Sequence, residues 1–144
     1  MSEAAPPVLA PVATIRVQVA SANSLGALQG RERRFVPILG GSIEGAGLRG
    51  AVLPGGSDIQ LLRPDGLLEI NARYVIDFGP DGQVMAHHRA LRRMPPDTGG
   101  AVYFRGTLAF EAPEGRLAWL NESIFIASGQ RRDQQVELAL FRVV

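Results

Sequence analysis

The sequence contains no cysteine and no lysine, and all 15 of its basic residues are arginine. Without cysteine the chain forms no disulfide, carries no thiolate nucleophile and holds no iron–sulfur cluster or Cys-ligated zinc. Without lysine it forms no Schiff base with a carbonyl substrate. Proton transfer by carboxyl, imidazole or phenol groups suits a chain of this composition. Arginine is also the better bidentate binder of carboxylates and phosphates.

Long apolar runs are also missing: none approaches the roughly 18 residues that a membrane helix needs, and the first residues lack the basic and apolar order of a signal peptide. We therefore expect a cytoplasmic protein with no membrane partner. The net charge of +1 gives no reason to expect a nucleic-acid partner. With 144 residues, of which 46% are hydrophobic and 20% charged, the chain should fold around a real core.

The distribution of turn residues is typical of an all-β protein. Residues 1–11 are rich in alanine and proline and predict a flexible N-terminal arm, followed by a single domain over residues 12–144. Apolar and polar residues alternate over residues 13–20, as in a half-buried strand. Residues 34–56 hold seven glycines and two prolines, a density that excludes a helix and predicts short strands broken by turns or bulges.

Two Pro-Asp-Gly turns, at residues 64–66 and 80–82, separate three segments that alternate like strands and so predict a meander. The segments 101–111, 116–128 and 135–144 predict further strands, and residues 94–100 predict a loop. No segment keeps a helical period. We therefore predict a single closed antiparallel β-barrel of about eight to ten strands with little helix, because closure removes exposed sheet edges.

His87 and His88 are the only histidines in the chain. Neighbouring residues of a strand point to opposite faces, so at most one of them enters the barrel. A two-histidine metal site is therefore not expected, and we predict no metal and no other cofactor. His88 shares a face with Val84 and Ala86, which favours an inward position. A buried histidine near a carboxylate can act as a general acid or base, and the alternative is a hydrogen-bonded histidine without a chemical role.

Four more candidates lie on the two strands before the histidines. Asp58 follows a glycine-rich turn, where its carboxylate either points into the barrel mouth or accepts backbone N–H groups of the turn. Gln60 shares its face. Arg73 and Tyr74 offer a cation and a phenol that can bind an enolate, phenolate or carboxylate. As neighbours they share a site only through a bulge or at a barrel end, and the alternative for Arg73 is a solvated ion-pair ladder.

The candidates beyond the histidines are fewer. Arg105 either contacts a ligand or pairs with an acidic residue such as Glu111 or Asp58. Trp119 is the only tryptophan and is expected in the core or in a pocket wall. Asn121 lies on the same face of the strand predicted there, so it is expected to supply a polar group inside the same cavity.

Five segments follow one another along the chain: RRFVPILGG, GLRGAVLPGGSDIQLLRPDG, NARYVIDFGPDG, YFRGTLAFE and WLN. Their order resembles the bacterial and fungal family catalogued as domain of unknown function 3237, over about Val12 to Val143. The resemblance implies a small antiparallel β-barrel, often oligomeric, without a cofactor and in most members without an assigned activity. It adds Arg34 to the polar residues that a fold requirement alone does not readily explain.

Three positions depart from the pattern of that family. Ile59 and Met85 stand where the family often has an aromatic residue, and His88 stands where asparagine is common. Smaller side chains together with a titratable histidine predict a widened pocket with acid–base capability.

The sequence supports two function classes. The first is a cofactor-independent lyase or isomerase that acts by acid–base chemistry on a small, largely apolar oxygenated metabolite, aromatic or polyketide-like, inside the barrel. Its catalytic residues would be His88, Asp58, Arg73 and Tyr74, and its substrate-binding residues Arg34, Gln60, His87, Arg105, Trp119 and Asn121. The second is a non-catalytic barrel that binds a small hydrophobic ligand. We expect a homo-oligomer in either case, with a dimer favoured; a filled barrel would instead indicate a purely structural role.

Overall fold

The computed structural model describes residues 3–94 and 102–144, and most of them lie in strands. Two short 3₁₀ helices, η1 and η2, interrupt the sequence of strands. In chain order the elements are β1 (Leu9–Val19), β2 (Asn23–Leu28), β3 (Arg31–Gly45), β4 (Leu48–Val52), β5 (Ser57–Leu62), β6 (Leu67–Asp77), η1 (Gly79–Asp81), β7 (Gln83–Arg93), β8 (Phe104–Glu111), η2 (Ala118–Glu122), β9 (Phe125–Arg132) and β10 (Gln135–Val143).

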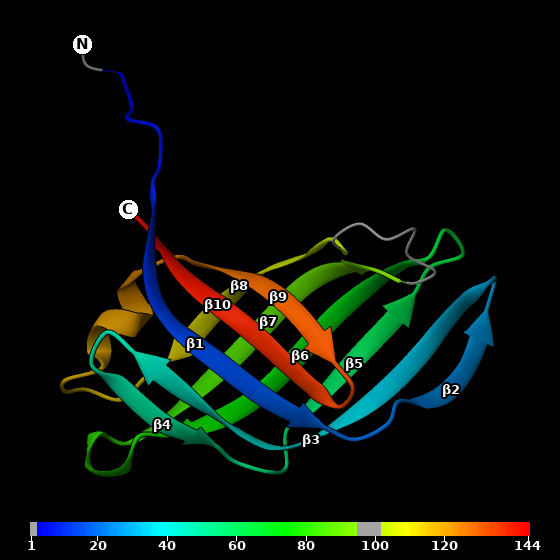
Figure 1. Cartoon of the computed structure of the whole chain (residues 1–144), viewed down its shortest axis with the longest axis horizontal. Helices are drawn as coiled ribbons and strands as arrows, with labels where there is room; N and C mark the ends of the chain where they lie inside the picture. The colour runs from blue at the N-terminus through cyan, green and yellow to red at the C-terminus, as the bar shows by residue number, and fades with distance from the viewer. Residues whose placement is uncertain (1–2, 95–101) are drawn as a thin grey trace.

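The ten strands close into an antiparallel barrel with eight strand positions around its circumference (Figure 1). Two of these positions are each filled by two strands: β1 and β2 lie end to end along one edge of β3, while β5 and β4 lie end to end along its other edge. The strands from β6 to β10 follow as neighbours, and β10 pairs with β1. Since β1 also pairs with β3, the sheet has no open side along its main body. The predicted barrel is confirmed.

The strand β3 bends at Gly40 and Gly41, which lets its two parts pair with different neighbouring strands. Before the bend it pairs with β2 and β5, and after it with β1 and β4. Gly41 has a φ of 146°, and a Cβ atom there would lie 1.9 Å from the carbonyl oxygen of Arg16 on β1. Only glycine permits this close approach. The glycines of residues 34–56 therefore shape one long, bent strand and its partner β4, rather than several short strands.

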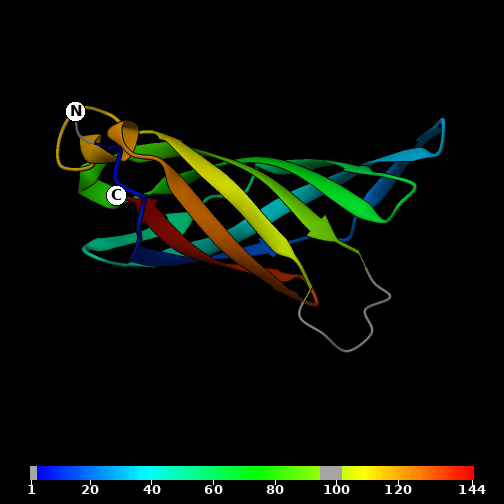
Figure 2. The same cartoon turned by 90° about the horizontal axis from the view of Figure 1, so that it is seen from above.

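The inward side chains form two zones along the barrel. At the end covered by η2 the interior is filled by apolar groups, among them Phe110, Phe125, Ile76 and Leu120. Burying each such side chain stabilises the fold by about 1.5–3 kcal/mol. Toward the other end, where β7 finishes and β8 begins (Figure 2), polar side chains replace some of the apolar ones. The second zone holds the candidate site.

The predicted elements differ from the structure in three places. Residues 116–128 do not form one strand: η2 turns Leu117 and Leu120 onto the barrel end, and β9 starts only at Phe125 and runs on to Arg132. The strand β2 lies between the alternating segment 13–20 and the glycine-rich segment 34–56, where no strand was predicted, because all residues of β2 are exposed and leave no alternating pattern. Strand pairing starts at Leu9, inside the predicted arm of residues 1–11.

Of the loop predicted over residues 94–100, all but the first residue lies outside the described residues. Within the described ranges, no helix has the length and apolar character needed to cross a membrane.

Candidate functional site

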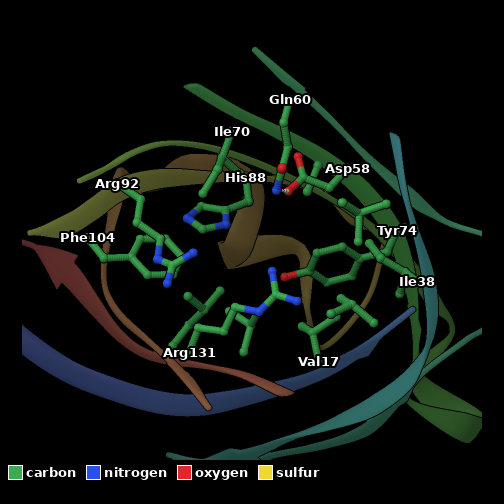
Figure 3. Close-up of a pocket in the computed structure, with 15 residues that line it drawn as sticks. Val17, Ile38, Asp58, Gln60, Ile70, Tyr74, His88, Arg92, Phe104 and Arg131 are labelled. Atoms are coloured by element: carbon green, nitrogen blue, oxygen red, sulfur yellow. Dashed lines mark hydrogen bonds between the residues drawn. The ribbon is translucent and has the colours of Figure 1, made fainter. Parts of the chain in front are cut away.

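A pocket lies inside the barrel at the end away from η2 (Figure 3). Its walls come from β1, β3 and every strand from β5 to β10, so it exists only because the barrel closes. The aliphatic part of the wall consists of Val17, Val19, Val36, Ile38, Ile70, Ala72, Val136 and Leu138. The cavity volume is about 40 Å³, room for little more than ordered water. A larger ligand must move the side chains at the mouth.

Asp58, Ala72 and His88 form one row across three neighbouring strands, since Ala72 faces Asp58 on β5 and His88 on β7. The backbones of β5 and β7 are separated by two strand spacings, about 10 Å. The small Ala72 leaves the space between them open, so that the carboxyl group and the imidazole both border the pocket.

Both carboxyl oxygens of Asp58 accept hydrogen bonds. Nε2 of Gln60 donates to Oδ2 at 2.7 Å, and the backbone N–H of Asn71 donates to Oδ1 at 3.0 Å. The ladder between β5 and β6 is interrupted beside Asn71, so the carboxylate takes the place of a missing backbone acceptor. Asp58 therefore has a structural role in addition to its position at the pocket. This is close to the backbone-accepting alternative considered from the sequence.

Three buried polar atoms of the described residues have no hydrogen-bond partner: Oε1 of Gln60, the hydroxyl of Tyr74 and Nε2 of His88. All three residues line the same pocket and are at most 3% exposed. Figure 3 shows the phenol of Tyr74 and the imidazole of His88 turned toward the middle of the pocket. Buried polar groups are nearly always paired, so three orphans around one cavity indicate a place for a ligand or ordered water.

Burial sets the protonation states of these groups. It lowers the pKa of His88 to about 4, with a further contribution from the neighbouring His87, so the imidazole is neutral at neutral pH. Burial also raises the pKa of Tyr74, which keeps the phenol protonated. The pKa of Asp58 is raised by burial, against the lowering effect of its hydrogen bonds with Gln60 and Asn71. A neutral base thus lies near a hydrogen-bond donor in an interior with little water.

Two arginines that the sequence analysis did not single out, Arg92 and Arg131, line the pocket near its mouth. Both follow the inward parity of their strands, since Arg92 lies four residues after the buried His88 and Arg131 four residues after the buried Ala127. Strand parity extended from His88 would have found Arg92. Residue polarity alone points the other way here, because the apolar Leu91 is exposed on the outer face while the charged Arg92 faces inward.

The other predicted site residues are divided between the two faces of the barrel. Arg34 lies on the inner face, opposite Gln60 in the ladder between β3 and β5. Arg73 is exposed on the outer face, opposite His87. Nε2 of His87 donates a 2.6 Å hydrogen bond to Oδ1 of Asn71, also outside the barrel. The structure thus brings Asp58, Gln60, Tyr74 and His88 together, with Arg34 nearby, and leaves Arg73 and His87 outside.

Arg105, Trp119 and Asn121 also lie away from the pocket. Arg105 is exposed, with Nη1 donating to its neighbour's carbonyl oxygen at 3.0 Å. Trp119 belongs to η2, where its ring contacts Phe125 at a centroid distance of 5.9 Å. Asn121 accepts from the backbone N–H of Ala112 at 2.8 Å and donates to its carbonyl at 2.9 Å. Because this segment forms a 3₁₀ helix and not the predicted strand, Asn121 stays outside the interior, and Trp119 packs against the core instead of lining the pocket.

Replacing Asn121 by alanine should test this structural position. Both backbone groups of Ala112 would lose their partner, so we expect the free energy of unfolding to fall by about 1–2 kcal/mol. Ligand binding in the pocket at the far end of β8 should not change. Urea unfolding measures the first effect and a binding titration the second; a large loss of binding in the folded variant would contradict this assignment.

The predicted widening of the pocket by Ile59 and Met85 is wrong. Ile59 borders a groove on the outside of the sheet together with Arg33 and Arg89, and Met85 is 41% exposed. Both lie at the outward parity of their strands, so their size does not affect the interior. Among the residues that the structure describes, no three histidine, aspartate or glutamate side chains come together as they would around a metal ion.

Comparison with known proteins places this barrel among relatives. A family model described as "Protein of unknown function (DUF3237)" matches residues 7–143. The chain belongs to this family. An UPF0311 protein of Rhodopseudomonas palustris is 31% identical over 144 residues, covering 92% of this chain and 94% of the relative. An UPF0311 protein of Clostridium acetobutylicum is 30% identical over 122 residues, 77% of each chain.

Three solved structures have the same architecture over nearly their whole length. The crystal structure of a conserved protein of unknown function from R. palustris matches with a TM-score of 0.89 and 30% identity, over 98% of this chain and all of that one. A β-barrel-like protein from Acinetobacter baumannii matches with a TM-score of 0.91 and 26% identity over the whole of both chains. A structure described as an enzyme from Penicillium herquei matches with a TM-score of 0.75 at 18% identity, covering 100% of this chain and 99% of that one, a likeness of fold alone.

Proposed function

We propose that this DUF3237 protein is a cofactor-independent lyase or isomerase that transfers protons on a small oxygenated molecule bound inside the barrel. The observation that carries the proposal is the set of three unpartnered buried polar atoms, on Gln60, Tyr74 and His88, around one pocket. Buried polar atoms of a purely structural interior are nearly always paired, so three unpaired ones around one cavity favour a binding role. The fold likeness to the Penicillium herquei enzyme is a precedent for catalysis on such a barrel, but it does not carry the argument.

His88 is the proposed general base. Its imidazole is neutral at neutral pH, because burial lowers its pKa to about 4. It would take a proton from a carbon next to a carbonyl group, and the electron pair of that C–H bond would form the enolate. In an isomerase the imidazolium returns the proton to another carbon. In a lyase the electron pair expels a leaving group instead, which takes the proton.

Tyr74 and Gln60 are proposed to bind the oxygen functions of the substrate. The phenol of Tyr74 stays protonated and can donate to the developing enolate oxygen, a contribution that is large in a dry site. Oε1 of Gln60 is free to accept from a substrate hydroxyl group. Asp58 holds the Gln60 amide through its 2.7 Å hydrogen bond and so orients it. Asp58 would thus be a positioning residue.

A second candidate function is ligand binding without turnover. It is favoured by the hydrogen bonds that both oxygens of Asp58 accept, which give this carboxylate a structural role and restrict its part in proton transfer. In that case the same orphan groups orient a ligand and transfer no proton.

Deuterium exchange separates the two functions without knowledge of the natural substrate. The purified protein is incubated in D₂O with a panel of small ketones, β-diketones and keto acids, and loss of the proton next to the carbonyl is followed by NMR. Catalysed exchange supports the enzyme. Saturable binding of panel compounds without exchange above the buffer rate would replace it by the binding function.

Replacing Tyr74 by phenylalanine should reduce this exchange by about 100-fold, because one donor to the enolate oxygen is removed. The free energy of unfolding should stay within about 1 kcal/mol of the wild type or rise, since the hydroxyl has no partner to lose. Exchange rates and urea unfolding of the same preparation give both values. Unchanged exchange, or marked destabilisation, would show that the hydroxyl is not the oxyanion donor.

A further inference from the structure

Three guanidinium groups gather at the open end of the barrel, on three different strands. Arg34 lies on β3 opposite Gln60, Arg92 on β7 opposite Phe104, and Arg131 on β9 opposite Val136. Each follows the inward parity of its strand. Figure 3 shows Arg92 and Arg131 extending into the pocket from the side that faces Asp58 and Tyr74.

These cations repel one another. Burial lowers the pKa of Arg92, and the charges of Arg131 and Arg34 lower it further. Like charges in a partly buried site raise the free energy of the folded state unless an anion compensates them. Positive charge therefore predominates at the open end.

Within residues 3–94 and 102–144, no carboxylate forms an ion pair with any of the three. The four ion pairs of these residues involve other arginines on the outside of the barrel, namely Arg16, Arg49, Arg63 and Arg116. Nη1 of Arg92 lies 3.7 Å from the sulfur of Met94, its guanidinium lies 5.9 Å from the centroid of the Phe104 ring, and Nε of Arg131 donates to a backbone carbonyl at 2.9 Å. Among the described residues, most N–H groups of the two guanidinium groups thus have no acceptor.

Asp58 offsets only part of this charge. It is the only buried acidic residue among those described. The charges of Arg131 and Arg34 act against the rise of its pKa, but neither arginine forms an ion pair with it. The polar atoms left open deeper in the pocket belong to neutral groups: a phenol, an amide and an imidazole. The pocket thus offers positive charge at the mouth and neutral hydrogen-bonding groups inside.

We propose that the substrate carries a carboxylate, which Arg92 and Arg131 bind at the mouth while Arg34 adds positive potential. The two planar forks match the two oxygens of a carboxylate. The aliphatic walls favour a monoanion over a dianion, whose desolvation costs more. A carboxylate held there directs the rest of the molecule toward Tyr74 and His88. The inference rests on the proposed function, and it names the substrate class of that site.

The test compares carboxylates with their neutral amides. Propanoate and benzoate are titrated by calorimetry against propanamide and benzamide, with inorganic phosphate as a further probe. The imidazole NMR signals report where binding occurs, because the chain has only two histidines. We expect carboxylates to bind at least about tenfold more tightly than amides, a difference of about 1.4 kcal/mol, and to shift the signals of His88 but not those of His87.

The variants Arg92→Gln and Arg131→Gln should each lose this preference and remain folded, because each removes a repelled charge. Arg132→Gln is the matched control: this residue follows Arg131 on β9 and is exposed. Two independent variants keep the test valid if one fails to fold. Equal affinity for carboxylates and amides, a preference retained in both variants, or tighter binding of phosphate would overturn the inference.

Deuterium exchange measured in parallel separates this inference from the proposed function. Exchange on neutral ketones without any carboxylate preference would refute the carboxylate inference and leave the enzyme intact. A carboxylate preference that depends on Arg92 and Arg131, with no exchange on any keto acid, would support the carboxylate site and refute catalysis.

Discussion

Replacing His88 by asparagine is expected to lower the catalysed deuterium exchange by about 100-fold or more, the usual contribution of a general base. The imidazole is the one neutral nitrogen base that lines the pocket. Asparagine keeps a polar side chain of smaller size, and its amide nitrogen does not accept a proton from carbon. Exchange rates of wild type and variant, compared at saturating ketone, measure the loss.

His87→Asn is the matched control for this experiment. His87 lies on the outer face, where its ring is hydrogen-bonded to Asn71. The control should exchange at the wild-type rate. If both variants exchange equally fast, His88 is not the base, and if the His87 variant alone loses activity, the site lies outside the barrel.

The pH profile gives a second readout of the base. Because burial lowers the pKa of His88 to about 4, the exchange rate should be level from neutral pH downward and fall only as the pH approaches 4. A solvent-exposed histidine would instead lose its base form near its ordinary pKa of about 6.5. A profile with its midpoint near the higher value would argue against a buried base.

Acid should destabilise the folded protein through the same histidine. Above pH 6.5 the imidazole is neutral in both the folded and unfolded chain, so it does not affect the difference in free energy. Between pH 6.5 and about 4 the unfolded chain takes up a proton that the folded chain does not, and stability falls. The full shift corresponds to about 3 kcal/mol, a large part of the stability of a small domain.

The loss of stability in acid is best measured as the difference in the free energy of unfolding between the wild type and His88→Asn. Urea unfolding of both proteins at several values from pH 7 to pH 4 should show the wild type losing about 3 kcal/mol more than the variant. Asp58 acts in the opposite sense, since its raised pKa makes the folded state take up a proton as the pH falls. It is present in both proteins and cancels. Parallel pH curves for the two proteins would mean that His88 is not desolvated.

Local sequence patterns were sufficient for the meander from β5 to β7. Two Pro-Asp-Gly turns set its connections, and alternation set the faces: Tyr74 and His88 lie inside, while Arg73 and His87 lie outside. Side-chain direction in a strand depends only on parity, so residues close in sequence suffice to assign it. The same rule, applied beyond His88, would have identified Arg92.

The segments with no alternation escaped this reasoning. The exposed strand β2 has no buried face to leave a pattern. Asn121 was predicted to lie inside the cavity and Trp119 in the core or a pocket wall, because the segment was taken as a strand. The 3₁₀ helix η2 instead places both at the end of the barrel, with Trp119 packed against the core. Whether a segment of mixed polarity forms a strand or a 3₁₀ turn depends on the surface that receives its apolar residues, and that surface comes from distant strands.

The sequence by itself thus determined the all-β class, the turns and the parity of each regular strand, because these depend on neighbouring residues. The tertiary structure alone decided the composition of the site. Asp58, His88 and Arg131 lie on β5, β7 and β9, and they face one another only because β1 pairs with both β3 and β10 to close the barrel. That closure is set by pairings between residues nearly the full length of the chain apart, such as Leu9 and Val143, which no local pattern encodes.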